Sequence, residues 1–207
     1  TQTTSDLTPT ITGTATVGAG ETLTVVVSGA TYTVTPAGGG AWSLDLGTAT
    51  PTSGSLTALA DGNTYNVTAT VTDTAGNATS DSTSSELVID TTAPGAPSVV
   101  SISTDTGVTD GVTSDNTLTF TGTAEANSTV EVFIDGSSIG TVTADGSGDW
   151  TYDHTGTILA DATYAVTATS TDAAGNTSSA SSAFDVTVDT TAPGAPTVVT
   201  QTTSDLT

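Results

Sequence analysis

The chain has no lysine and no arginine. Its 207 residues contain no Lys or Arg against 22 Asp and Glu, which gives a formal net charge of −22 at pH 7. Nucleic acid is excluded as a partner, because neutralising phosphates requires basic residues. Repulsion between the carboxylates must instead be relieved by solvent, salt or bound cations, and a divalent metal ion is the obvious neutraliser.

Several other features are missing. Without cysteine the chain has no disulfide, no thiolate metal site and no thiol nucleophile. It contains neither a long apolar run nor a basic segment followed by an apolar one, so we expect no membrane span and no signal peptide in these residues. Helix formers such as Leu, Glu and Lys are scarce, whereas Thr and Val are abundant and favour strands. The composition predicts an all-β protein.

The chain does contain repeats. Residues 1–8 (TQTTSDLT) return as residues 200–207, which sets a period of 199 residues. Within that period DTTAPGAP at Asp90–Pro97 recurs at Asp189–Pro196, 99 residues later. Each long unit therefore contains two related modules, and we expect the chain to be a window from a longer tandem array. The predicted domains are a first module over residues 1–92 whose first strand precedes Thr1 in the array, a second over residues 93–191, and the start of the next over residues 192–207.

Apolar and polar residues alternate along matching segments of the two modules. Residues 65–72 alternate Tyr, Val, Ala and Val with Asn and Thr, and residues 164–169 show a similar pattern. Strands of this kind, separated by turn residues such as Asp135-Gly136, are typical of a sandwich of antiparallel sheets. We predict tandem seven-stranded immunoglobulin-like (fibronectin-like) β-sandwiches. In the second module the strands are Ser98–Ser103, Leu118–Ala124, Val130–Ile134, Ile139–Thr143, Trp150–Asp153, Tyr164–Thr171 and Phe184–Asp189.

Two further features concern the connections. The first module has an insertion around Gly47–Leu59, because Trp42 and Tyr65 are 23 residues apart whereas Trp150 and Tyr164 are 14 apart. Between the modules, the prolines of residues 93–97 restrict φ and remove backbone donors. We therefore expect a short, stiff, extended connection there.

Several segments carry a family resemblance. DTTAPGAP at Asp90 and Asp189, DTAGN at Asp73–Asn77, DAAGN at Asp172–Asn176 and the long segment Asp105–Val130 resemble bacterial immunoglobulin-like repeats. Such repeats occur in giant adhesins, including biofilm-associated proteins and the extender regions of RTX-type adhesins. The resemblance implies tandem domains that reach the cell surface by type I secretion, many of which bind calcium near domain junctions.

The predicted topology gathers acidic residues at the junction between the modules. In a seven-stranded sandwich the loop between the last two strands lies at the end where the chain enters. This places Asp172 and Asn176 beside the incoming Asp90, and the loop that holds Glu125 shares that end. Calcium takes six to eight oxygen ligands, which two modules together can supply. We predict a Ca²⁺ site formed by Asp90, Glu125 and Asp172.

Two more cation sites are predicted. At the other junction Asp189 would combine with Asp73 and Glu21 of a neighbouring repeat, so that site is incomplete within this chain. The loop with Asp105, Asp110 and Asp115 also presents spaced carboxylates, although it lacks the spacing of an EF-hand. The first module has QTTSDLTP in place of this loop, so the loop site does not carry over to it. The alternative is that these aspartates are solvated turn residues that bond their own backbone.

Catalysis and sugar binding are not favoured. A catalytic triad would need His154, the single histidine, which is more simply read as a surface residue at a strand end. Trp42 and Trp150 occupy equivalent positions in the two modules, which indicates core packing instead of sugar stacking. The carboxylate pair Asp149 and Asp153 lies in no evident cleft. We expect no enzymatic activity.

The sequence therefore predicts structural extender modules of a long, calcium-stiffened bacterial surface adhesin. They would project a distal adhesive region and support cell adhesion or biofilm formation outside the cell. Partners would be neighbouring modules of the same chain and, in a fibre, like chains, with no nucleic acid and no membrane insertion. The alternatives are a self-assembling extracellular filament or surface-layer protein, in which residues 197–207 could pair with another subunit's sheet edge, and a carbohydrate-binding module.

Overall fold

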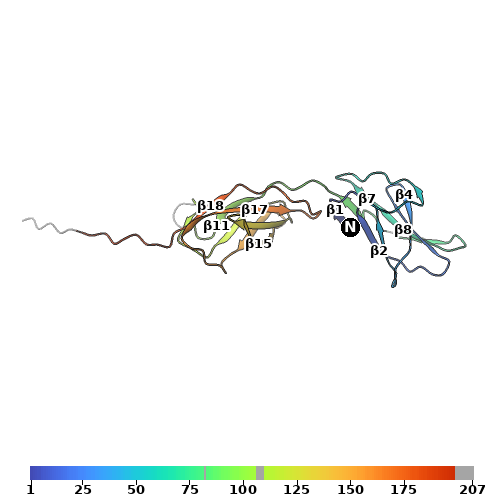
Figure 1. The fold of residues 1–207 in the computed structure, drawn as a ribbon, viewed down its shortest axis with the longest axis horizontal. Helices are drawn as coiled ribbons and strands as arrows, with labels where there is room; N and C mark the ends of the chain where they lie inside the picture. The colour runs from blue at the N-terminus through green and yellow to red at the C-terminus, as the bar shows by residue number, and fades with distance from the viewer. Residues whose placement is uncertain (82, 106–109, 199–207) are drawn as a thin grey trace, which may run out of the picture.

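The computed structural model describes residues 1–81, 83–105 and 110–198. They form two β-sandwiches that lie end to end and are joined by an extended connection (Figure 1). These residues include no helix, and so none that is long and apolar enough to cross a membrane. The predicted all-β fold with tandem sandwiches is confirmed.

The second module consists of two sheets. The larger has five strands in the order β12-β18-β17-β14-β15, and the smaller has three in the order β11-β13-β16. All pairings are antiparallel except that of β12 with β18. The strands are β11 (Ser98–Ile102), β12 (Val112–Thr113), β13 (Thr119–Thr123), β14 (Thr129–Ile134), β15 (Ser137–Thr143), β16 (Asp149–Asp153), β17 (Ala162–Thr171) and β18 (Phe184–Val188).

The seven strands expected in this module are all present, with ends within two residues of those predicted. The eighth, β12, was missed because two residues, Val112 and Thr113, are too few to show an alternating pattern.

The first module repeats this arrangement with differences at its edges. Its sheets have the orders β6-β4-β3-β8-β9, β2-β5 and β1-β10-β7, and β1 runs parallel to β10 as β12 does to β18. The strands are β1 (Gln2–Thr4), β2 (Thr10–Thr14), β3 (Thr22–Val27), β4 (Ala30–Val34), β5 (Ala41–Asp45), β6 (Ser53–Gly54), β7 (Thr64–Tyr65), β8 (Val67–Thr72), β9 (Ala78–Ser80) and β10 (Leu87–Ile89).

Two of these differences lie at the edges of the sheets. The insertion predicted around Gly47–Leu59 contributes β6, which pairs with β4 at the edge of the larger sheet. In the smaller sheet, β2 pairs with β5 alone, whereas its counterpart β13 also pairs with β11. Among the described residues, the second edge of β2 has no strand beside it.

Each module has its own hydrophobic core between its sheets. The side chains that alternation placed on the inner face are buried or packed against the core, including Val67 in the first module and Val166 in the second. Trp42 and Trp150 are 8% and 2% exposed, which confirms that both are core residues and argues against a sugar-stacking role. The two cores are separate clusters, as expected for two modules that lie end to end (Figure 1).

Candidate functional site: the junction between the modules

The chain leaves the first module along a path fixed by hydrogen bonds. The backbone N–H of Asp90 donates to the carbonyl of Thr4 (3.0 Å), which extends the parallel pairing of β1 and β10. The Asp61 carboxylate accepts hydrogen bonds from the Thr91 backbone N–H and the Thr92 hydroxyl. These bonds, that of the Thr91 N–H above all, hold the pKa of Asp61 below its ordinary value. The start of the connection is thus held by the first module.

The DAAGN turn of the second module reaches the same segment. Asp172 Oδ1 accepts hydrogen bonds from the backbone N–H groups of Ala174 (2.8 Å) and Asn176 (2.9 Å). The Asn176 side-chain nitrogen donates to Asp172 Oδ2 (2.9 Å) and to the carbonyl oxygen of Asp90 (2.8 Å). One amide group therefore links the two modules.

The ionisation of Asp172 reflects this setting. Burial raises its pKa, but the hydrogen bonds from the Asn176 side chain and from the turn backbone outweigh burial, so the pKa lies below its ordinary value. The carboxylate is therefore ionised at neutral pH, which strengthens the hydrogen bonds it accepts.

Further contacts complete the junction. The backbone N–H of Ser5, which follows β1, donates to the carbonyl of Ala174 in the DAAGN turn (3.2 Å). The Ser170 hydroxyl donates to the carbonyl of Gly95 (3.4 Å), and Pro94 and Pro97 are buried. The connection is therefore held at its start by the first module and along its length by the second.

The junction brings together two of its three predicted metal ligands. Asp90 and Asp172 meet through Asn176, as the topology predicts, although Asp90 contributes its carbonyl while its carboxylate accepts the Thr92 N–H (3.1 Å). Glu125 lies in the β13–β14 loop, where its carbonyl accepts hydrogen bonds from Ser128. Within the described ranges, no three His, Cys, Asp or Glu side chains are grouped so that they could hold a metal ion.

The second predicted cation site lies in the segment before β13, and residues 106–109 of that loop are outside the described residues. Asp105 accepts the Gly111 N–H (3.1 Å), Asp110 the Val112 N–H (3.1 Å) and Asp115 the Thr117 N–H (2.9 Å). The Thr117 backbone N–H and hydroxyl lower the pKa of Asp115. Each carboxylate thus bonds backbone close to it in the sequence, and calcium binding by this loop stays a prediction.

A family model described as a bacterial Ig-like domain matches residues 1–91 and, separately, residues 93–190. The chain belongs to the bacterial Ig-like domain family. The resemblance identified from the DTTAPGAP and D-x-AGN segments is confirmed, with one match for each module. Comparison with curated protein sequences gives no match.

Solved structures with similarity to these Ig-like modules come from several bacterial proteins. The fibronectin(III)-like modules of Clostridium thermocellum CbhA are 12% identical, over 90% of this chain and 87% of that chain, with a TM-score of 0.43. A structure of a 1.5-MDa bacterial ice-binding adhesin is 27% identical, over 89% of this chain and 59% of that one (TM-score 0.36). The BSP domain of a biofilm associated protein is 21% identical, over 93% of this chain and 29% of that one (TM-score 0.36).

The outer end of the first Ig-like module presents a second copy of the junction turn. Asp73 accepts the backbone N–H groups of Ala75 and Asn77 and the Asn77 side-chain N–H, all at 2.8 Å. The Asn77 side chain is the largest cause of the lowered pKa of Asp73. Glu21, the other residue predicted here, accepts the Gly18 N–H (2.7 Å). Asp189, the third predicted ligand, lies in the other Ig-like module, where it accepts the Thr191 N–H (3.0 Å).

Sequence reasoning missed the aspartates that hold the chain as it leaves each Ig-like module. Asp161 bonds Thr190 and Thr191 as Asp61 bonds Thr91 and Thr92, and the Thr190 hydroxyl is the main cause of its lowered pKa. The available signal was the shared Leu-Ala-Asp segment shortly before Tyr65 and Tyr164. That segment is a weak signal, because single aspartates in turns are common.

The single histidine packs beside two aromatic rings. The His154 ring lies 6.0 Å from the Phe120 ring and 6.2 Å from the Tyr152 ring, centroid to centroid, and burial lowers its pKa. At neutral pH it is therefore an uncharged ring that packs beside the core of the second Ig-like module.

Replacing Asn176 with alanine is expected to loosen the junction. The variant loses the bond to Asp90 that spans the modules and the bond to Asp172 within the turn, so the second module should be destabilised by about 1 kcal/mol. More importantly, the distribution of distances between spin labels on one introduced cysteine in each module should broaden. Asn77→Ala is the matched control, because Asn77 bonds Asp73 in the same way but does not bridge to the other module. Equal broadening in both variants would show that Asn176 does not link the modules.

Proposed function

We propose that these Ig-like modules are extender modules of a bacterial cell-surface adhesin, exported from the cell, which project an adhesive region and support adhesion or biofilm formation. The observation that carries this proposal is the junction. Its connecting segment is hydrogen-bonded to the first module through Asp61 and Thr4 and to the second through Asn176 and Ser170. A connection held from both sides suits a part that transmits length and direction.

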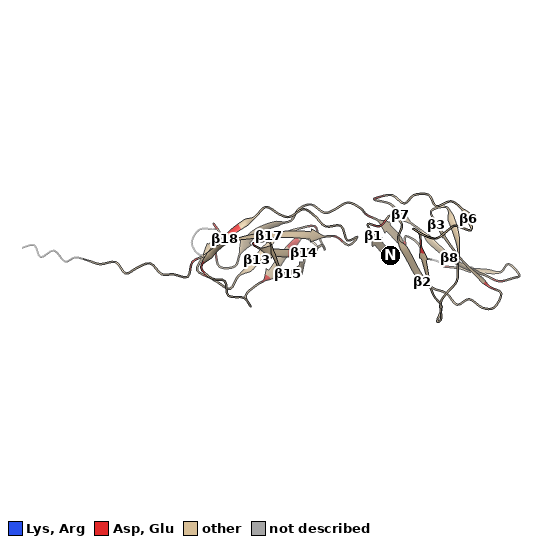
Figure 2. Ribbon diagram, in the orientation of Figure 1, with Lys and Arg blue, Asp and Glu red and all other residues tan. Residues whose placement is uncertain are grey.

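The mechanism is mechanical. A strand rises about 3.3 Å per residue, so the ten residues of β17 span about 33 Å and set the length each module adds to the array. Bending at the junction would stretch the bonds from Asn176 to Asp90 and from Ser5 to Ala174. The negative charge supports the same role, because carboxylates are spread over both modules with no basic residue beside them (Figure 2) and so oppose collapse of the array on itself.

Calcium is the finer part of the proposal. The junction offers the Asp90 carbonyl and the Asp172 carboxylate, which are the hard oxygen ligands that calcium prefers. As folded, the Asn176 amide nitrogen lies between these two oxygens, so the amide must turn and present Oδ1 before all three residues can hold a cation. When bound, the ion would neutralise the repulsion between the modules. Sites of this kind in extracellular modules bind calcium at about 10⁻⁴ to 10⁻³ M.

The experiment measures X-ray scattering and thermal unfolding of the chain in about 1 mM calcium, within the range of such sites, and in chelator. The proposal expects an elongated particle in both conditions, with a raised Tm and a narrower distribution of inter-module distances in calcium. Asp172→Asn, which removes one charge at nearly constant size, should abolish the calcium effect alone. Identical results in the two conditions would overturn the calcium part, and a compact particle in both would overturn the extender role.

A further inference from the structure

The chain carries four copies of a sequence that protein glycosylation uses. An asparagine followed two residues later by serine or threonine, with no proline between them, is the acceptor for sugars attached through nitrogen, and it is used on surface loops. Serine and threonine are so frequent in this chain that the sequence alone does not choose among the four. The structure does, because the amide nitrogen must be exposed and free of bonds within the fold. The four acceptors are Asn66, Asn77, Asn127 and Asn176.

The amide nitrogen of Asn176 is already used at the junction. It donates to the carbonyl of Asp90 (2.8 Å) and to Asp172 Oδ2 (2.9 Å), so both of its hydrogens are engaged. The Ser178 that completes this segment is buried, and its hydroxyl oxygen accepts the backbone N–H of Ser170 (2.9 Å). A sugar on the Asn176 nitrogen would break one of the two bonds that the amide makes.

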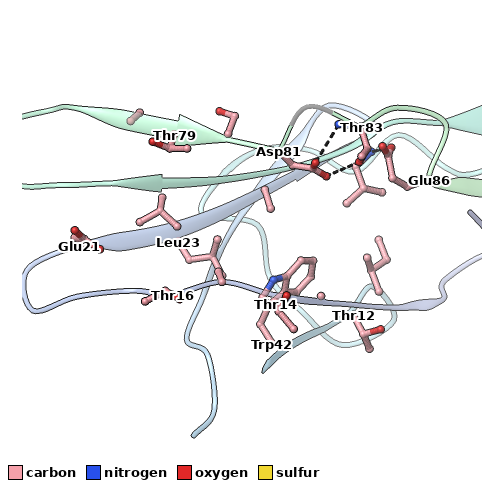
Figure 3. A pocket seen from close by; sticks show the side chains of 18 of the residues that line it. Thr12, Thr14, Thr16, Glu21, Leu23, Trp42, Thr79, Asp81, Thr83 and Glu86 are labelled. Atoms are coloured by element: carbon pink, nitrogen blue, oxygen red, sulfur yellow. Dashed lines mark hydrogen bonds between the residues drawn. The ribbon is translucent and has the colours of Figure 1, made fainter. Parts of the chain in front are cut away.

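Asn77 is held in a similar way in the first module. Its amide nitrogen donates to Asp73 Oδ2 (2.8 Å). The Thr79 that completes this segment pairs with Val71, whose side chain packs against the core. Figure 3 shows Thr79 among the residues that line a pocket of the first module. This threonine therefore belongs to the inner side of the sheet and not to an outer loop.

Asn66 is exposed but lies between two strands that run on from each other. It stands between β7 and β8, and its Oδ1 accepts the backbone N–H of Ser85 (2.8 Å). Thr68, which completes this segment, is half-buried within β8 and pairs with Val26 of β3. An enzyme that drew this segment into its own binding site would have to break the pairing of β8 with β3.

Asn127 combines the features that the other three lack. It is exposed in the turn between β13 and β14, with a φ of 63°. Backbone groups hold this turn: the Asn127 N–H donates to the carbonyl of Asp145 (3.2 Å), and the N–H and hydroxyl of Ser128 donate to the carbonyl of Glu125. Within the described part of the chain, no hydrogen bond engages the Asn127 side chain. Thr129 completes the segment at the exposed first position of β14.

Two further features of this loop favour an enzyme's approach. Glu125 stands two residues before Asn127, where the other three acceptors have Thr or Ala. A carboxylate at this point offers a basic enzyme surface a charge-assisted hydrogen bond. Thr129 pairs with Thr171 at the end of β17, so the loop lies at the end of the second module that faces the first. A sugar on Asn127 would leave the bonds of the junction intact.

We propose that Asn127 is an N-glycosylation site. The enzyme is an asparagine glycosyltransferase, and the donor is a sugar activated at its anomeric carbon by a diphosphate. Asn127 Nδ2 forms a bond to the anomeric carbon while the bond from that carbon to the diphosphate oxygen breaks. The amide loses one proton, and the diphosphate leaves with the electron pair of the broken bond. The same chemistry serves a nucleotide sugar in the cytoplasm and an oligosaccharide on a lipid diphosphate at the membrane, and it does not depend on the adhesin role.

Mass spectrometry of the protein isolated from the bacterium that produces it tests the site. Trypsin does not cleave the chain, which has no Lys or Arg, whereas cleavage after glutamate releases residues 126–131, in which Asn127 is the single asparagine. Two variants are made in the same bacterium: Asn127→Gln removes the acceptor, and Thr129→Val removes the hydroxyl at nearly constant shape. Asn66→Gln is the matched control, because it removes an exposed asparagine from another of the four segments.

The expected result is a mass increase on the 126–131 peptide that is present in the unaltered chain and in Asn66→Gln and is lost in both Asn127→Gln and Thr129→Val. An increase of a single hexose assigns the nucleotide sugar as donor, and a longer oligosaccharide assigns the lipid-linked one. Glu125→Gln, measured on the intact chain, should lower the modified fraction. An unmodified 126–131 peptide would overturn the proposal, and so would a sugar carried by Asn176 in place of Asn127.

Discussion

Replacing Phe120 with alanine is expected to destabilise the second module by about 3–5 kcal/mol, the usual loss for a fully buried phenylalanine. The Phe120 side chain has no exposed surface, and it packs in a core cluster with Trp150 and Val166. The cavity left behind is bounded by strands of both sheets, which cannot close without breaking their pairing. For a module of this size the loss corresponds to a fall of more than about 10 °C in Tm.

Differential scanning calorimetry checks this prediction, because two separate cores should give two unfolding transitions. In Phe120→Ala the transition of the second module moves down while that of the first stays close to its original temperature. Ile11→Ala is the matched control, since Ile11 occupies the same position in β2 and belongs to the other core. If either variant shifts both transitions equally, the modules are not independent folding units.

Replacing Gly122 with alanine is expected to have the second large effect, a loss of about 3 kcal/mol from a single methyl group. A Cβ at this position would overlap the carbonyl oxygen of Ser98 and the indole ring of Trp150. The strand β11 and the buried ring cannot both stay in place, so β11 must move away from β13. The first module offers the comparison, because a Cβ on Gly13 meets the ring of Trp42 as its nearest neighbour and no backbone carbonyl among its three closest atoms.

Hydrogen exchange measures the two parts of this prediction together. Gly122→Ala should lose protection at the amides of β11. It should also lower the stability of the second module by more than Gly13→Ala lowers the stability of the first. The two variants should differ because β11 lies beside β13, whereas among the described residues no strand lies beside the second edge of β2. Equal losses of stability, with β11 still protected, would show that the carbonyl of Ser98 does not set the need for glycine.

The fold could be predicted well where residues alternate over four or more positions. Segments such as residues 164–171 alternate because one face packs on the core, so their sequence reports their environment. The short strands β6 and β12 could not be found, because two residues carry no period. Their pairing is decided by the neighbouring strands β4 and β18 and not by their own composition.

The junction was predictable in its location and only partly in its chemistry. Topology alone places the turn of Asp172 beside Asp90, and the structure brings the two together. Sequence could not show that Asn176 presents N–H groups to both, because a side-chain amide can turn either its oxygen or its nitrogen to a neighbour. Glu125 lies in the β13–β14 loop, where its carbonyl accepts hydrogen bonds from Ser128, and its part in a cation site stays a prediction.

The central claim is that the junction holds the two modules as one rod, and residual dipolar couplings of the isotope-labelled chain test it most directly. Couplings measured separately for residues 1–89 and 98–188 each define an alignment tensor. The bonds from Asn176 to Asp90 and from Ser5 to Ala174 predict that the two tensors agree in orientation and magnitude. Tensors of clearly different magnitude would mean that the modules reorient independently, and that result would contradict the account.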